Sequence, residues 1–293
     1  MNVTGDAVLS IQSQVAYGHV GNSAATLPLQ RLGFDVIPIN TVQLAHHPGH
    51  GRWCGHKVEP ERIAQIVDGV AQRGGLRRCV ALLSGYLGDA AVGPIVLDAL
   101  AALREVRPDA LYLCDPVIGD DGPGVFVSAG IPELIQGRLV PAAAVVTPNR
   151  FELELLSGRP VACLDDARQA ARALLALGPA LVVVTGLPLG DGLGVLAESG
   201  EGAWQVTTPR LTGGAGGIDG DGHIGGAGDA FCALFLGHYL RASGIGAALE
   251  RAVSAMFELV ERTHASGADE LCLVAAQDGF DPAIPRFRAQ RLD

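Results

Sequence analysis

Short apolar runs alternate with longer segments of helical spacing along most of the chain. The runs are rich in Val, Leu and Ala and lack polar alternation, which is typical of strands covered on both faces. The pattern therefore predicts a parallel sheet with helices on either side. The expected strands are Ala7–Ile11, Asp35–Val42, Cys79–Leu83, Ala110–Cys114, Ala143–Thr147 and Leu181–Thr185.

The segments between and after these runs space their apolar residues as helices do. The expected helices are Asn22–Arg31, Pro60–Arg73, Ala91–Val106, Ile131–Gly137, Arg150–Leu156, Asp165–Leu177, Ala227–Arg241 and Ala247–Thr263. Two shorter, more polar runs, Gly194–Ala197 and Ala203–Thr207, predict a hairpin at one sheet edge, and a last apolar piece follows at Leu271–Ala275. No internal repeat interrupts the pattern, which predicts one α/β domain over residues 1–293.

Composition and charge limit the possible partners. A chain of 293 residues with 48% hydrophobic residues can bury a large core. Its formal net charge of −10 argues against nucleic acid as a partner. No apolar run reaches the ~18 residues that span a bilayer, and no basic segment precedes Ala7–Ile11, so we expect a cytoplasmic protein without membrane contact. The six cysteines form no Cys-x-x-Cys pair, which indicates reduced thiols rather than disulfides or zinc ligands.

The run Gly225-Gly226-Ala227-Gly228-Asp229 leads directly into the apolar stretch Ala230–Leu240. Glycines let a backbone pass close to a ligand, and a helix start points unpaired N–H groups at phosphate. An acid on that first turn can accept a proton from an attacking hydroxyl. Phosphate-binding N–H groups beside such an acid are typical of a small-molecule kinase. The alternative is a simple connector, in which Asp229 interacts only with the helix dipole.

Polar residues follow the expected strands at their carboxyl ends, where open α/β sheets bind ligands. We therefore expect these residues to converge on one site. They are Gln12-Ser13, Gln43, Ser84-Gly85-Tyr86, Asp115-Pro116 and Thr147-Pro148-Asn149.

The acids near these strand ends allow two interpretations. Asp115, Asp120, Asp121, Glu152 and Glu154 could supply the oxygen ligands that Mg²⁺ takes when it is carried by a nucleotide. Acids also often cap turns and the first turns of helices, and the residues alone slightly favour this second interpretation.

Ser13, Tyr86 and the cluster His46-His47-Pro48-Gly49-His50 could line a pocket for a ring substrate. We interpret the histidines as part of a substrate-covering loop, because no set of zinc ligands is evident around them. The loops Leu44–His56 and Gly213–Gly225 are the expected covers that exclude water.

From about Val8 to the C-terminus, the sequence resembles the pyridoxal kinases of the ribokinase superfamily. The matching motifs are Ser10-Ile11-Gln12-Ser13, Tyr17-Gly18-His19-Val20-Gly21-Asn22-Ser23-Ala24-Ala25, Asn40-Thr41-Val42-Gln43, Ser84-Gly85-Tyr86, Cys114-Asp115-Pro116-Val117-Ile118-Gly119-Asp120, Thr147-Pro148-Asn149-Arg150-Phe151-Glu152-Leu153-Glu154, Gly226-Ala227-Gly228-Asp229 and Val274-Ala275-Ala276-Gln277. The glycine-acid element is common to the superfamily, whereas Ser-Ile-Gln-Ser with Gly-Asn-Ser-Ala-Ala is typical of the vitamin B6 branch.

The resemblance implies a three-layer, ribokinase-like α/β/α fold and phosphorylation of the 5′-hydroxyl of pyridoxal by Mg²⁺-ATP. It also implies a homodimer and a monovalent cation. Asp229 would be the base, and Gly226, Ala227 and Gly228 would offer N–H groups to the phosphoryl group. The implied substrate residues are Ser13, Val20, Thr41, His47, Tyr86 and Asp229. The implied nucleotide residues are Asp115, Thr147, Asn149, Glu152, Thr185, Thr208, Pro209, Arg210, Leu211, Gly226 and Gly228, and the metal residues are Asp115, Asp120 and Glu152.

Two positions depart from the family pattern. Pro48 stands where relatives commonly have a substrate-holding threonine, and Ala227 replaces a threonine or valine before Gly-Asp. The choice among the B6 vitamers therefore stays open. Two other functions are alternatives: a hydroxymethylpyrimidine kinase of the same superfamily, or a B6-binding protein without catalysis.

Overall fold

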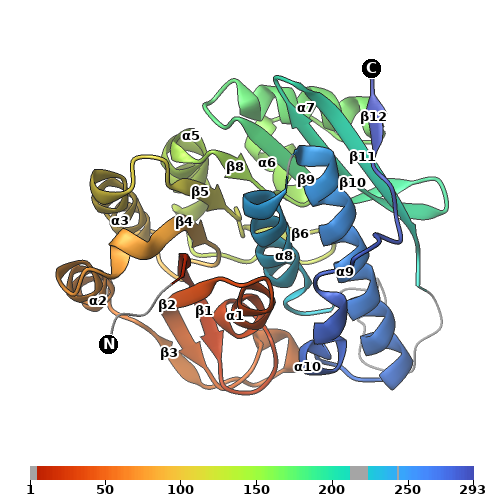
Figure 1. Ribbon diagram of the computed structural model, residues 1–293. Coiled ribbons are helices and arrows are strands. Elements are labelled where there is room, and N and C mark those ends of the chain that lie inside the picture. Colours follow the sequence, from red (N-terminus) through yellow and green to blue (C-terminus); the bar gives the residue numbers. More distant parts are fainter. Residues whose placement is uncertain (1–4, 212–223, 243) are drawn as a thin grey trace.

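A ten-stranded sheet forms the middle layer in the computed structural model, which describes residues 5–211, 224–242 and 244–293 (Figure 1). Its order is β12-β11-β10-β9-β8-β5-β4-β1-β2-β3. The central neighbours are parallel: β1 (Ala7–Val15), β2 (Asp35–Leu44), β4 (Cys79–Ser84), β5 (Leu111–Cys114), β8 (Val145–Val146) and β9 (Leu181–Leu189). The edges are antiparallel: β3 (Gly55–Lys57), β10 (Gly192–Ser199), β11 (Gly202–Pro209) and β12 (Gln290–Leu292).

Helices cover both faces of this sheet (Figure 1). One face packs against α1 (Asn22–Arg31), α8 (Ala227–Arg241), α9 (Ile245–Ser266) and α10 (Leu273–Ala276). The other packs against α2 (Pro60–Gln72), α3 (Val92–Val106), α4 (Ile131–Leu134), α5 (Val140–Ala142), α6 (Arg150–Ser157) and α7 (Leu164–Leu175). This arrangement confirms the three-layer α/β/α fold with a mostly parallel sheet.

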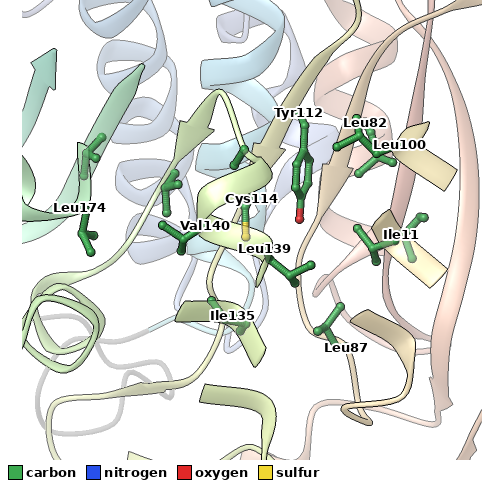
Figure 2. Packing of buried hydrophobic residues seen from close by; sticks show 14 of the residues in the cluster. Ile11, Leu82, Leu87, Leu100, Tyr112, Cys114, Ile135, Leu139, Val140 and Leu174 are labelled. Carbon is green, nitrogen blue, oxygen red and sulfur yellow. The ribbon is translucent and has the colours of Figure 1, made fainter. Parts of the chain in front are cut away.

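Alternation along the strands explains why they contain so few polar residues. Val8 and Leu9 are adjacent in β1 and fully buried, yet each belongs to a different hydrophobic cluster. Because successive strand side chains point to opposite faces, a strand between two helical layers needs apolar residues at nearly every position. Figure 2 shows part of the cluster that contains Leu9, in which Tyr112 and Cys114 of β5 lie near Leu139.

Several segments differ from the expectations. The strand expected at Ala143–Thr147 contains only Val145–Val146, and the helix expected at Ile131–Gly137 continues as a wider π-helical turn, Ile135–Leu139, before α5. The hairpin expected near residues 194–207 is longer, and its first strand, β10, pairs with β9 along the whole length of β9. The pattern missed β3 and the small two-stranded sheet of β6 (Gly119–Asp120) and β7 (Gly124–Val125), because both are short and lack an apolar run. Most of the predicted loop Gly213–Gly225 lies outside the described residues.

Two further observations concern the cysteines and membranes. All six cysteines are free, and Cys79, Cys114 and Cys232 are buried. Across the described ranges, no helix combines the length and apolarity needed to traverse a bilayer.

Candidate active site

The start of α8 is pressed against the turn that precedes α1. Gly226 has a left-handed backbone with φ of 80°. A Cβ at this position would lie 2.9 Å from the carbonyl carbon of His19 and would overlap its oxygen. Only glycine fits both the φ angle and the close approach. The residue at 226 therefore sets the distance between the helix N-terminus and the turn at residues 17–21.

The N–H groups at this helix start differ in their availability. The N–H of Ala227 donates to the carbonyl of Ile224 at 3.2 Å. Gly228 is exposed, and a Cβ built there would meet no atom within 4 Å. Of the three residues predicted to offer N–H groups, Gly228 therefore has the most open surroundings, one residue before Asp229.

Asp229 lies in the first turn of α8 and is partly buried. Burial raises the pKa of its carboxyl to about 6, although the hydrogen bond from the backbone N–H of Gly21 lowers it. A carboxylate with this pKa is mostly ionised at neutral pH and can still accept a proton, which suits a general base.

Residues from three segments pack against the two glycines Gly21 and Gly225, which flank the start of α8. Gly21 packs so closely on Ser13 that a Cβ would overlap the carbonyl and hydroxyl groups of Ser13. At Gly225, a Cβ would lie 3.7 Å from the ring of His47 and 3.7 Å from Cγ1 of Val20. The structure thus brings the predicted substrate residues Ser13, Val20 and His47 together around the start of α8. We call this region the substrate side.

Thr41 and Tyr86 are linked at the ends of β2 and β4. The buried Thr41 hydroxyl donates to the carbonyl of Tyr86 at 2.7 Å, so it positions the tyrosine backbone. Burial raises the pKa of the Tyr86 hydroxyl.

A buried polar network explains why the motif around Ser13 contains so many polar residues. Ser10 donates to Oδ1 of Asn22 at 2.7 Å, and Gln12 Nε2 donates to the Ser10 hydroxyl at 2.9 Å. Asn22 Nδ2 reaches Oδ1 of Asn40 at 2.9 Å. This network joins β1, β2 and α1, and buried polar groups satisfied in this way fix one geometry. Gln12 is one of the residues expected at the site, whereas no pattern in the sequence indicates the roles of Ser10 and Asn40, which pair with Asn22 across elements.

The predicted nucleotide residues Asn149 and Glu152 form a capping box at the start of α6. Asn149 Oδ1 accepts the N–H of Glu152 at 2.8 Å, and Glu152 Oε2 accepts the N–H of Asn149 at 2.9 Å. Oε1 of Glu152 accepts the N–H of Ile118 at 2.9 Å, and Asn149 Nδ2 donates to the carbonyl of Gly119 at 2.8 Å. Thr185 pairs with Asn149 as a parallel bridge. These contacts tie the ends of β5, β8 and β9 to α6.

Asp115 connects this end of the site with Asp229. It is buried, and Thr147 Oγ1 lies 3.4 Å from its Oδ1 and 3.2 Å from Sγ of Cys232. Burial, with the added repulsion of Asp229, raises the pKa of Asp115 to about 8. Burial and the charge of Asp115 also raise the pKa of Glu152. The three carboxyls are electrostatically linked from the helix start at α8 to the helix start at α6.

The metal residues predicted from the resemblance do not form a closed cage. In the part of the chain that the structure describes, no three His, Cys, Asp or Glu side chains are grouped to hold a metal ion. Asp120 Oδ1 accepts the N–H of Asp121 at 2.8 Å, and Glu152 is held by backbone N–H groups. Buried carboxyls with raised pKa values nevertheless have the chemistry of a site that a cation would stabilise.

The last group of predicted nucleotide residues lies at the antiparallel edge. Thr208 and Pro209 end β11, where Thr208 Oγ1 donates to the carbonyl of Leu193 at 3.4 Å. Arg210 and Leu211 follow, at the boundary of the described residues. Their contact with a nucleotide stays a prediction.

The fold has three α/β/α layers, and a glycine turn opens the helix α8 beside the carboxyl ends of parallel strands. The first turn of this helix contains an acid, Asp229, whose pKa is raised to about 6. These features together are typical of the ribokinase-like small-molecule kinases. The family described as phosphomethylpyrimidine kinase matches residues 55–270. The chain belongs to the pyridoxal kinase family: it is 46% identical over 290 residues to a pyridoxal kinase of Rubrobacter xylanophilus, with 97% of each chain covered. A pyridoxal kinase of Deinococcus radiodurans is 45% identical over 294 residues, covering 98% of this chain and 96% of the relative.

Solved structures agree with this assignment. The pyridoxal kinase of Leishmania donovani in complex with ADP and pyridoxamine is 29% identical, with a TM-score of 0.89 over 98% of this chain and 100% of that chain. The pyridoxal kinase of Entamoeba histolytica has the same TM-score of 0.89 at 22% identity, covering 99% of this chain and 100% of that chain, and supports the fold.

Proposed function

We propose that this chain transfers the γ-phosphoryl group of ATP to the 5′-hydroxyl of pyridoxal, giving pyridoxal 5′-phosphate and ADP. The observation that carries the proposal is the position of Asp229. Its carboxyl has a pKa of about 6, receives the N–H of Gly21 and stands in the turn that His47 and Val20 approach. Family membership and the ADP and pyridoxamine named for the Leishmania donovani structure support the substrates.

In this proposal, Asp229 takes the proton of the 5′-hydroxyl while the hydroxyl oxygen attacks the γ-phosphorus of ATP and ADP leaves. The N–H groups at the start of α8, with Gly228 the most open, face the transferring phosphoryl group and stabilise its charge. Phosphoryl transfer asks a protein mainly for alignment and charge neutralisation. In this proposal the close packing of Gly226 on His19 supplies alignment, because it fixes the start of α8 against the turn at residues 17–21.

Ser13, Val20, Thr41, His47 and Tyr86 form the substrate side of the proposal, and Thr41 acts through the backbone of Tyr86. The nucleotide end comprises Asp115, Thr147, Asn149, Glu152 and Thr185, with Thr208 to Leu211 toward the base or ribose. Asp115, Asp120 and Glu152 are the residues that would hold Mg²⁺, which when bound neutralises the phosphate charge. A monovalent cation, a cytoplasmic location and a homodimer complete the proposal.

Two observations favour pyridoxal over hydroxymethylpyrimidine. The phosphomethylpyrimidine kinase profile begins at residue 55 and leaves out Ser13, Val20, Thr41 and His47. Two curated relatives that span these residues at 45–46% identity are pyridoxal kinases. A binding protein without catalysis would not need an acid in the first helical turn directly after the glycine turn.

The test is product analysis with Mg²⁺-ATP and pyridoxal, pyridoxine, pyridoxamine or hydroxymethylpyrimidine, with ADP release followed in parallel. We expect pyridoxal 5′-phosphate from the wild type. Asp229→Asn should lower kcat by about 10²- to 10⁴-fold and change the KM for ATP by less than about twofold. Near-normal kcat in this variant would refute the base assignment.

Asp165→Asn is the matched control, because Asp165 also lies in the first turn of a helix, α7, outside the site. If Asp229 acted only on the helix dipole, the two variants would show similarly small effects. Tight pyridoxal binding without ATP turnover in the wild type would instead support the B6-binding alternative.

A further inference from the structure

Glu270 lies outside every motif that carries the proposed reaction, yet its side chain reaches the substrate side. It follows α9 and Gly267, and its side chain is only 13% exposed. Its Oε2 accepts the N–H of His19 at 3.0 Å, across a sequence separation of 251 residues. Its Oε1 lies 2.9 Å from Nε2 of His50 in the β2–β3 loop. One carboxylate therefore joins three segments that are distant in the sequence.

Gly18 allows this contact to form. It has a φ of 87°, and a Cβ at this position would overlap the carboxylate of Glu270. The turn at residues 17–21 thus leaves room for one particular side chain from the other end of the chain. A surface acid that merely filled space would not need a glycine of this conformation opposite it.

The two contacts of Glu270 lead to the reacting groups by short routes. The carbonyl of His19, on the residue whose N–H is bound, packs against Gly226, and Gly21 donates its N–H to Asp229. His50 ends the short helix Pro48–His50, directly after His47, whose ring approaches Gly225. His47 and His50 also contact each other as rings, with centroids 6.1 Å apart.

The burial of Oε1 explains why Glu270 depends on its contact with His50. This oxygen is buried, and Nε2 of His50 lies 2.9 Å from it in an ion-pair contact that lacks the geometry of a hydrogen bond. A buried carboxylate oxygen without a hydrogen bond is costly, and the close imidazole of His50 is the group that can reduce that cost when it carries a positive charge. Glu270 and His50 therefore stabilise each other in one arrangement of the loop.

We propose that Glu270 is a positioning residue for the substrate side: it fixes the loop at residues 45–54 through His50 and the turn at residues 17–21 through the N–H of His19. This inference rests on the proposed function, because it assigns the effect to pyridoxal. The His50 contact orders the covering loop and so governs pyridoxal affinity. The His19 contact holds the peptide beside Gly226 and so governs turnover.

Steady-state kinetics of two Glu270 variants test this assignment. Glu270→Gln keeps the size of the side chain and an oxygen for the His19 N–H but loses the charge that attracts His50. We expect the KM for pyridoxal to rise about tenfold, with kcat and the KM for ATP within about twofold. Glu270→Ala removes both contacts, so kcat should fall as well.

A double-mutant cycle identifies the partner. His50→Gln alone should raise the KM for pyridoxal about as much as Glu270→Gln, and the double variant should add little to either. Glu258→Gln is the matched control, because Glu258 lies on α9 and pairs with Arg262 at the surface. Its kinetics should equal those of the wild type.

Unchanged KM for pyridoxal in Glu270→Gln would overturn the proposal. So would an equal rise of both KM values together with a lower Tm, since that result shows a general structural role. Direct titration of pyridoxal onto wild type and Glu270→Gln separates this inference from the proposed function. If the wild type binds pyridoxal but makes no phosphate ester, the proposed function fails, and a weaker affinity of the variant still supports the role of Glu270.

Discussion

Gly226→Ala tests whether the contact between α8 and the turn at residues 17–21 sets the geometry for phosphoryl transfer. The new methyl group would lie 2.9 Å from the carbonyl carbon of His19 and 3.3 Å from Cα of Val20, with a deeper overlap at the carbonyl oxygen. The two backbones must therefore move apart by more than about 1 Å to reach ordinary contact. A shift of about 1 Å in an aligned site can cost about 100-fold in rate.

The left-handed backbone adds a cost that must be separated from the collision. Gly74 has a φ of 81°, close to the 80° of Gly226, and a Cβ there meets nothing within 4 Å. Gly74→Ala should therefore lose about 1 kcal/mol of unfolding free energy from the φ angle alone and keep wild-type kinetics. Gly226→Ala should lose more stability and about 100-fold in kcat/KM for pyridoxal.

The assay is ADP release with saturating Mg²⁺-ATP and varied pyridoxal, beside urea denaturation of both variants. If Gly226→Ala kept kcat/KM within about threefold of wild type, the idea that this contact aligns the reactants would be wrong. If the two variants lost the same stability, the predicted collision with His19 would be absent.

Three further predictions follow from the carboxyls and the helix cap. Because the base must be ionised and the pKa of Asp229 is about 6, kcat/KM should fall about tenfold per pH unit below pH 6, and a pH-rate profile without that limb contradicts the assignment. Asp115, with a pKa of about 8, keeps its proton in the native state to higher pH than in the unfolded chain, so unfolding free energy decreases as pH rises between 3.8 and about 8. Asp115→Asn should remove that decrease and lower turnover. In urea denaturation at pH 8, the ligand-free variant should be more stable than the wild type by more than about 1 kcal/mol. An unchanged pH dependence of the unfolding free energy would contradict this. Asn149→Ala should lose about 1–2 kcal/mol with the capping box and raise the KM for ATP but not for pyridoxal, and an equal rise in both would contradict a role at the nucleotide end alone.

The central part of the fold was predictable because its strands are buried on both faces. Each position of such a strand must be apolar, so runs such as Cys79–Leu83 are visible in the sequence without any partner strand. β3 could not be predicted in this way. Gly55, His56 and Lys57 are exposed, and the strand exists because the backbone of β2 pairs with it. Its formation depends on a neighbour rather than on its own residues.

The residues of the candidate site likewise differ in whether the sequence predicts them. Ser13, Asp115 and Thr147 follow predicted strands, and Asp229 follows a glycine run. Their place at the carboxyl ends of the parallel strands was therefore predictable from the sequence. Glu270 gave no such signal, because no strand end or glycine run marks it. Its relation to Gly18 and His50 arises only when the segment that follows α9 reaches the turn before α1 and the β2–β3 loop. Long-range contacts of single polar side chains have no local pattern.

The acidic residues of the site are arranged against stability in the ligand-free protein. Asp229 raises the pKa of Asp115, and Asp115 raises that of Glu152, so each ionised carboxyl makes the next one harder to ionise. Buried like charges destabilise a fold unless a cation joins them. The neutral network of Ser10, Gln12 and Asn22 has the opposite effect, because each of its side chains finds a hydrogen-bond partner. The chain therefore places satisfied polar groups where the substrate side needs a fixed shape. At the nucleotide end it keeps carboxyls that repel one another, and we expect a bound cation to relieve this repulsion and so to couple cation binding to folding stability.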